Sequence, residues 1–244
     1  MRGLEAPELV ELHERGRSLP PVRRAVLLLQ TALPAASAEG VVDLPVGRRD
    51  ARILELRART LGPVLQSETR CPRCDERLEL DLRSDELMAM ADNGAPEAPE
   101  PLTVEHDGWV VRLRLSSSRD LLAVAEAGGT ERDLLARCLV EVSNGDGGAD
   151  AADLPDPVVE AVQTAMAEAD PLADLQLALT CPACGHAWRS PFDPAAFFWG
   201  EIEAWLPRVL REVHLLASAY GWSEREILGM DAWRRSQYLR LVSA

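Results

Sequence analysis

The sequence predicts an α+β fold that is mostly helical, in which two pairs of short antiparallel strands are separated by a long acidic insertion. Three observations predict it. Apolar residues recur at helical spacing over most of the 244 residues. Two Cys-Pro-x-Cys turns, at 71–74 and 181–184, lie beside stretches that alternate apolar and polar residues, as half-buried strands do. Residues 71–180 contain 8 Arg against 24 Asp and Glu, so the acidity belongs to the part between the two turns.

Residues 1–62 are predicted to form an N-terminal helical region. Segments 5–15 and 20–32 have the length and apolar spacing of short helices. After a connector, an amphipathic helix is expected over 47–61, with arginines around its apolar side chains. The Gly-Pro pair that follows ends this helix, because proline cannot continue the helical hydrogen bonding.

The two cysteine turns predict a ribbon that is split between residues 63–84 and 172–192. The stretch 78–82 leaves the first turn, and the stretch 173–180 leads into the second, each alternating with a period of two. Residues 187–192 leave the second turn as a further strand. Each cysteine turn is therefore expected at the tip of a hairpin.

Cys71, Cys74, Cys181 and Cys184 are the predicted ligands of one structural Zn2+, which makes this a split zinc ribbon. Two thiolates three residues apart on a tight turn point at one cation, and two such turns supply a tetrahedral sulfur set. Two vicinal disulfides are the alternative, which the sparse cysteine usage disfavours. His186 is a further candidate ligand, although four sulfurs complete the set without it. Four protein ligands leave no open position for water, so we expect a structural metal.

The acidic insertion, residues 85–171, is predicted to combine helices with a hairpin. Asp107-Gly108 between two alternating stretches is a strong signal for a type I′ turn. The tract 143–157 is rich in Gly and Asp and is expected to be a flexible linker. The expected elements are a helix over 85–91, a turn at Asn93-Gly94, strands over 102–105 and 109–115, and helices over 118–126, 130–142 and 157–169.

Residues 193–244 are predicted to form a C-terminal helical hairpin. Asp193 is a suitable N-cap, and Pro194 suits the first helical position because its ring presets the helical φ. The helix is expected to run to about Tyr220, and Pro207 should kink it.

The turn of this hairpin is also specified. Gly221 suits the left-handed position after the first helix. Ser223 and Glu226 have the spacing of a capping box, which starts a second helix that ends near Val242. The region also carries four tryptophans, for which core positions are favoured over interface positions: Trp199, Trp205, Trp222 and Trp233.

Composition and absent motifs restrict the function. The net charge of −14 disfavours binding to a phosphate backbone. The N-terminal stretch has frequent charges and the apolar runs are short, so we expect no signal peptide, no membrane contact and a cytoplasmic location. The GxSxG, Walker, HExxH and GxGxxG motifs are missing, so we expect no enzyme. Cys138 is expected in the core and His214 at a helix interface.

Four segments resemble known proteins: LPVGRRDARILELRARTLGP, the CPRC turn, LTCPACGHAWRSPFD and FFWGEIEAWLPRVLREVHLLASAYGWSEREIL. They resemble baseplate-associated proteins of contractile phage tails and phage-tail-like injection systems, and are distantly similar to the T-even-type baseplate hub assembly chaperone family. The resemblance covers most of the chain outside 90–155, and AYGWSEREIL is its most specific part. It implies a structural or assembly (chaperone-like) protein that contacts baseplate or hub proteins and enters a phage-tail-like particle.

The alternative function is a zinc-ribbon module that binds nucleic acid or the transcription machinery. It requires one contiguous positive face beside the ribbon, because nucleic-acid binding depends on clustered cations. The side chains expected to form that face are Arg48, Arg49, Arg52, Arg57 and Arg59. A metalloenzyme is a third possibility, which requires an open coordination position.

Overall fold

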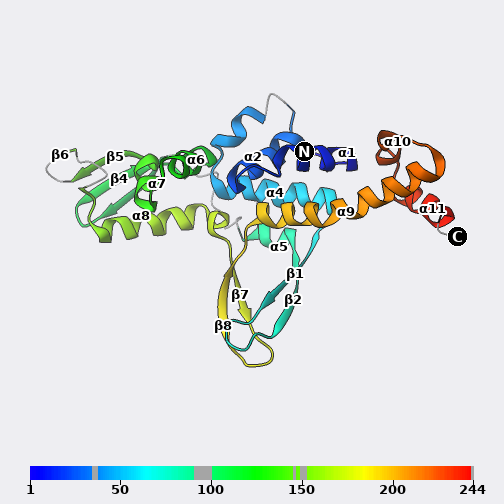
Figure 1. Cartoon of the computed structure of the whole chain (residues 1–244). Coiled ribbons are helices and arrows are strands. Elements are labelled where there is room, and N and C mark those ends of the chain that lie inside the picture. Colours follow the sequence, from blue (N-terminus) through cyan, green and yellow to red (C-terminus); the bar gives the residue numbers. More distant parts are fainter. Residues whose placement is uncertain (35–37, 91–100, 145–146, 149–152, 243–244) are drawn as a thin grey trace.

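The computed structural model describes residues 1–34, 38–90, 101–144, 147–148 and 153–242. Figure 1 shows a central group of helices, with the insertion at one end, the C-terminal helices at the other, and two hairpins projecting from the middle. The predicted α+β class with short antiparallel strand pairs is confirmed. The predicted turn at Asn93-Gly94 lies outside the described residues.

The central group, here called the helical body, consists of α1 (Ala6–Gly16), α2 (Pro21–Ala32), α4 (Val46–Leu61) and the first half of α9 (Pro194–Tyr220). A short 3-10 helix, η1 (Glu39–Asp43), connects α2 to α4. Sixteen buried hydrophobic residues, from these elements and from Leu4 just before α1, form one cluster, in which Phe198 and Leu28 are fully buried. Gly16 allows α1 to lie close to α9, because a Cβ there would lie 2.3 Å from the Trp199 ring.

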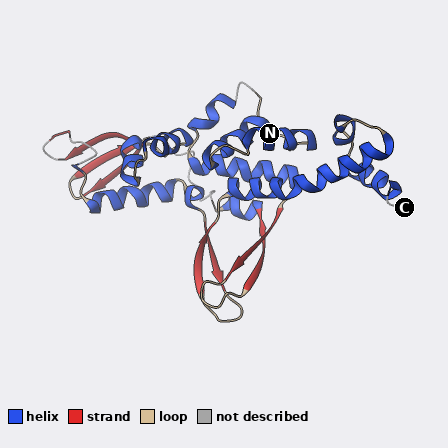
Figure 2. Ribbon diagram, viewed as in Figure 1, coloured by secondary structure: helices blue, strands red, loops and turns tan. Residues whose placement is uncertain are grey.

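The two hairpins form separate two-stranded antiparallel sheets. One pairs β1 (Val64–Arg70) with β2 (Arg77–Arg83), and the other pairs β7 (Gln176–Thr180) with β8 (Ala187–Pro191). Figure 2 shows both hairpins extending from the helical body and converging at their tips. Their contact is therefore at the cysteine turns rather than along a shared strand ladder.

The roots of the hairpins are fixed to the helical body by a second apolar cluster. It joins Leu54 of α4 to Leu65 of β1, Leu87 of α5 (Ser84–Ala89) and Leu172 of η3 (Pro171–Asp174). Residues 171–174, of which 173–174 were expected to start a strand, form this 3-10 helix, which packs against α4 through Leu172.

The insertion is a four-stranded antiparallel sheet with helices beside it. Its strand order is β3 (Leu102–His106), β4 (Trp109–Leu113), β5 (Leu139–Asn144) and β6 (Gly147–Gly148). α8 (Asp156–Ala169) and α7 (Glu131–Cys138) pack their apolar side chains on one face of this sheet. α6 (Ser118–Ala127) leads from β4 to α7 after a capping box at Ser117.

Two expectations for the insertion are wrong. The helix predicted over 130–142 ends at Cys138, and residues 139–144 instead form strand β5. Pairing with β4 stabilises the extended form, which suits Val140 and Val142 because β-branched side chains favour strands. Part of the tract predicted as a flexible linker is also a strand, since Gly147–Gly148 pairs with β5.

The C-terminal region begins as predicted. Asp193 accepts hydrogen bonds from the backbone N–H groups of Ala195 and Ala196, and α9 continues to Tyr220 with Pro207 inside it. Figure 1 shows α9 changing direction in its second half. Gly221 then adopts φ +70°, the left-handed conformation that glycine accepts without strain.

The second helix of the predicted hairpin is divided into α10 (Glu224–Leu228) and α11 (Ala232–Val242). The capping box of Ser223 and Glu226 starts α10 as expected. Asp231 then accepts hydrogen bonds from the backbone N–H groups at the start of α11, which makes a separate helix there. Among the described residues, no helix is both long and apolar enough to cross a bilayer.

Candidate metal centre

The two cysteine turns have the same local structure. In the first, the Cys71 N–H donates to the Glu76 carbonyl and the Asp75 N–H donates to the Cys71 carbonyl, both at 2.9 Å. In the second, Cys181 and Gly185 make the equivalent bonds at 2.8 and 2.9 Å. Asp75 and Gly185 both have φ between 60° and 69°, a conformation that Asp and Gly accept better than most residues. Each turn therefore presents its two sulfurs in the same way.

All four sulfurs of these turns come together at the hairpin tips. Cys71 Sγ lies 3.7 Å from Cys184 Sγ, and Cys74 Sγ lies 3.6 Å from Cys181 Sγ. The four sulfurs lie within 4.8 Å of one another. A Zn–S bond of about 2.3 Å places the corners of a sulfur tetrahedron about 3.8 Å apart. The four cysteines are therefore arranged so that they could hold a metal ion.

The alternative of two vicinal disulfides does not fit the positions of the four sulfurs. All five cysteines are free, and the sulfur pairs at 3.6 and 3.7 Å each join one turn to the other. Their separations exceed the bond length of about 2.05 Å that a disulfide requires. The cluster is thus formed by thiols.

The surroundings differ for each sulfur. Burial acts to raise the pKa of Cys71, but hydrogen bonds from the backbone N–H groups of Arg73 and Cys74 outweigh it and lower the pKa to about 7. At Cys74 the Glu76 backbone acts to lower the pKa, but the neighbouring sulfurs outweigh it and raise the pKa to about 12. Crowded thiols resist losing several protons together, and a bound divalent cation offsets this repulsion.

A small apolar shell surrounds the sulfurs. Cys71, Cys181 and Leu78 are buried together, and Trp188 packs against them. His186 lies outside the sulfur cluster and stacks on Trp188, with ring centroids 5.9 Å apart. The shell excludes water from one side of the cluster and leaves its tip exposed.

Several other predicted positions have mixed outcomes. Cys138 is buried, as expected of a core residue, and burial raises its pKa to about 11. His214 is exposed on α9, so its predicted place at a helix interface is wrong. Trp199 lies in the core as expected, whereas Trp233 is 71% exposed.

The arginine face required by the nucleic-acid alternative is not formed on α4. Arg57 is buried and pairs with Glu201 on α9, with Nη2 2.6 Å from Oε1. Arg49 is also buried, and its guanidinium donates to Asp50 and to Ser118 at 2.7 and 3.0 Å. These two side chains connect elements of the fold, so the five arginines do not share one exposed face.

Sequence reasoning missed a buried polar cluster at the junction between the helical body and the insertion. Asp170 accepts a hydrogen bond of 2.8 Å from the Gly47 N–H, where a Cβ would lie 2.1 Å from the same carboxylate. Burial raises the pKa of Asp170, and it raises that of Asp50 to about 6 despite the Arg49 guanidinium. The two partners Gly47 and Asp170 are 123 residues apart, so no local pattern marks them.

A third buried carboxylate, that of Asp120, lies within the insertion. Burial acts to raise the pKa of Asp120, but hydrogen bonds from Arg114 and Ser117 outweigh it and lower the pKa. Arg137 also contacts this carboxylate at 3.3 Å. Asp120 thus connects the end of β4 to α6 and α7.

Comparison with known proteins gives a family match. A family model described as T4 bacteriophage base plate protein matches residues 28–199, which is more than two thirds of the chain. The matched span begins within α2, includes α4, both cysteine turns, the insertion and the first turns of α9, and ends before the AYGWSEREIL segment. No curated protein and no solved structure matches.

Proposed function

Since the chain belongs to the T4 bacteriophage base plate protein family, we propose that it is a structural or assembly (chaperone-like) protein of a contractile injection system or phage-tail-like base plate. It acts by contacts with baseplate or hub proteins and not by catalysis. It is made in the cytoplasm and enters the particle during assembly. The observation that carries this proposal is the family match across 28–199.

We further propose that Cys71, Cys74, Cys181 and Cys184 hold one structural Zn2+. Support comes from sulfur separations of 3.6 and 3.7 Å, close to the edge of a zinc–sulfur tetrahedron. A metal there joins two hairpins that belong to separate sheets. Four protein ligands fill a tetrahedral site and leave no position for a substrate, so the ion acts as a clasp.

The function is tested by expressing an affinity-tagged chain in a strain that carries the particle genes. We expect baseplate or hub proteins to be recovered with the chain. Recovery from lysate alone indicates an assembly factor, whereas presence in purified particles indicates a permanent subunit. Recovery of neither, from lysate and from particles alike, contradicts the proposed function.

A matched pair of variants tests whether the clasp matters for these contacts. Cys71→Ser removes one sulfur of the cluster, whereas Cys138→Ser changes a buried cysteine far from it in the sequence. We expect Cys71→Ser to reduce recovery of the partner proteins and Cys138→Ser to retain it. Equal recovery with both variants would show that the sulfur cluster is not needed for contact with the partner proteins. Salt-sensitive retention on DNA or RNA would favour the nucleic-acid alternative instead.

A further inference from the structure

The outer face of α11 carries an apolar stripe that the described chain leaves exposed. Trp233 and Leu241 are 71% and 68% exposed, the highest values among the large hydrophobic side chains of the described residues. They are eight residues apart, with Gln237 between them, so all three lie on one face of the helix. Exposed tryptophan is a frequent anchor of protein interfaces.

The stripe is held outward by the contacts of the opposite face. Arg235 is buried and pairs with Glu212 of α9, with Nε 2.8 Å from Oε2. Tyr238 packs edge-on against the Trp222 ring, with centroids 4.8 Å apart. Arg234 and Arg240 are exposed and flank the stripe, and the Arg234 guanidinium also lies 5.8 Å from the centroid of the Tyr238 ring. A complementary surface must therefore be apolar and carry carboxylates.

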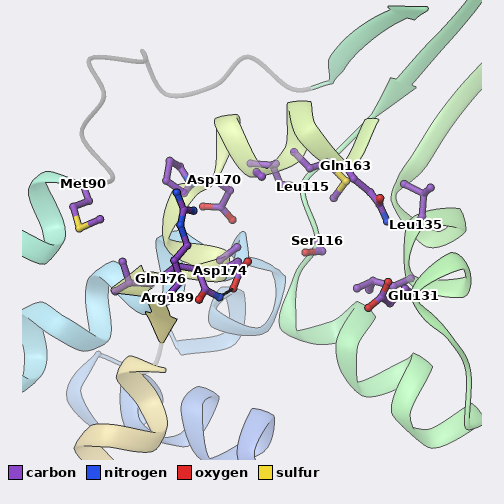
Figure 3. A pocket seen from close by; sticks show the side chains of 16 residues that line it. Met90, Leu115, Ser116, Glu131, Leu135, Gln163, Asp170, Asp174, Gln176 and Arg189 are labelled. Carbon is purple, nitrogen blue, oxygen red and sulfur yellow. Dashed lines mark hydrogen bonds between the residues drawn. The ribbon is translucent and has the colours of Figure 1, made fainter. Parts of the chain in front are cut away.

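A cavity with these properties lies between the insertion and the root of the β7–β8 hairpin. Its volume is about 780 Å³, large enough for several side chains, and its lining is mostly apolar, including Leu115, Leu135 and Met166. Figure 3 shows Leu115 and Leu135 on the insertion side of the cavity, and Asp174 of η3, Gln176 of β7 and Arg189 of β8 on the other side.

The charges of the cavity complement those of α11. Among the described residues that line it, Glu131, Asp170 and Asp174 are acidic and Arg189 supplies one guanidinium. Glu131 and Asp174 are exposed and can face a cation, whereas Asp170 is buried by its contact with Gly47. The described lining therefore carries a net negative charge. The carboxylates of Glu131 and Asp174 are accessible to a partner from solvent.

We propose that α11 of one copy docks into this cavity of a second copy, with Trp233 among the apolar side chains and the flanking arginines beside the carboxylates. Figure 1 places α11 and the insertion at opposite ends of the molecule, so α11 cannot reach the cavity of its own chain. The two surfaces differ, so the contact is heterologous, and repetition of it closes a ring or extends a filament. This inference goes beyond the proposed function and concerns the purified chain alone.

Sedimentation velocity of the full, metal-loaded chain over a concentration series tests the proposal. We expect the wild type to associate, and added salt to weaken association because the rim contacts are ionic. Trp233→Ala should weaken association by on the order of tenfold or more, as loss of an interface anchor does. Ala167→Trp, a change at an exposed lining position of α8, should block the cavity and weaken association equally.

Mixing the two variants gives the decisive result. The Ala167→Trp chain keeps an intact α11 and the Trp233→Ala chain keeps an intact cavity, so the mixture should form a one-to-one complex that cannot extend. Val140→Ala, which shortens a 59% exposed side chain elsewhere, should associate like the wild type. A monomeric wild type, an unaffected variant of either surface, or failure of the mixture to pair overturns the proposal. Recovery of baseplate proteins by the tagged chain is a separate readout, so either idea can fail alone.

Discussion

The helical body buries sixteen hydrophobic residues in one cluster, whereas the place where the two hairpins meet buries three, two of them cysteines. Burial of apolar side chains stabilises the first region at about 25 cal/mol per Å². The second region buries too little apolar surface to be stabilised in this way. Its four sulfurs instead lie within 4.8 Å of one another. The two regions of one chain therefore depend on different forces.

This difference has a consequence for chain topology. The two hairpins are separated by the whole insertion, so bringing their tips together costs chain entropy that increases with loop length. A metal ion bound by the four sulfurs would add on the order of 10 kcal/mol where the apo site is unfolded, which exceeds that cost. We therefore expect the structure of the hairpins to depend on bound metal and that of the helical body to be independent of it.

Removal of metal should have the largest effect. We expect a chelator to abolish amide protection in β1, β2, β7 and β8 while most of the helical circular dichroism remains, because the body has its own core. Hydrogen exchange with and without chelator measures this. If the chelator abolished the helical circular dichroism as well as the amide protection of the hairpins, the two regions would unfold as one cooperative unit, which would contradict this prediction.

A cavity in the helical body should be the next largest effect. Phe198 is fully buried in the helical body, and Phe198→Ala should lower the free energy of unfolding by about 3–5 kcal/mol. Denaturant unfolding followed by circular dichroism measures it. The variant should still bind metal with unchanged stoichiometry, and metal loss here would show that the hairpins depend on this core.

A smaller, pH-dependent effect is expected at the junction between the body and the insertion. The pKa of Asp50 is raised by burial to about 6 in the folded chain, so the folded state holds this proton more tightly than the unfolded state. The contribution of Asp50 to stability is therefore present at low pH and lost as the pH rises from about 4 to about 6. Asp50→Asn should remove this decline. The difference between the two stability–pH curves gives the result, and parallel curves would contradict it.

The smallest effect is expected for an ion pair on the hairpins. Arg77 pairs with Glu68 across β1 and β2, but both side chains are more than half exposed. Arg77→Ala should change the midpoint of thermal unfolding little, because exposed ion pairs contribute about 0–1 kcal/mol. A large destabilisation would mean that ion pairs, and not the sulfur cluster, hold the hairpins.

The elements that could be predicted are those with local signals. The cysteine turns, the Asp193 cap and the Ser223–Glu226 capping box each depend on residues within a few positions, and each is found. The sulfur cluster itself followed from two matching turns, although 106 residues separate them.

The elements that could not be predicted depend on distant partners. The extended conformation of β5 is stabilised by pairing with β4, some thirty residues earlier. The residues just before β5 are helical, so the local sequence does not indicate a strand. Burial of Arg57 is set by Glu201, which is 144 residues away. Exposure of Trp233 is set by how α11 packs on α9, since composition alone favours a core position.

Metal analysis of anaerobically purified protein tests the central claim most directly. We predict one zinc ion per chain, retained in Cys138→Ser and lost in Cys71→Ser. Protein that carries no stoichiometric metal while its thiols remain reduced would contradict the claim that a sulfur-bound ion joins the two hairpins.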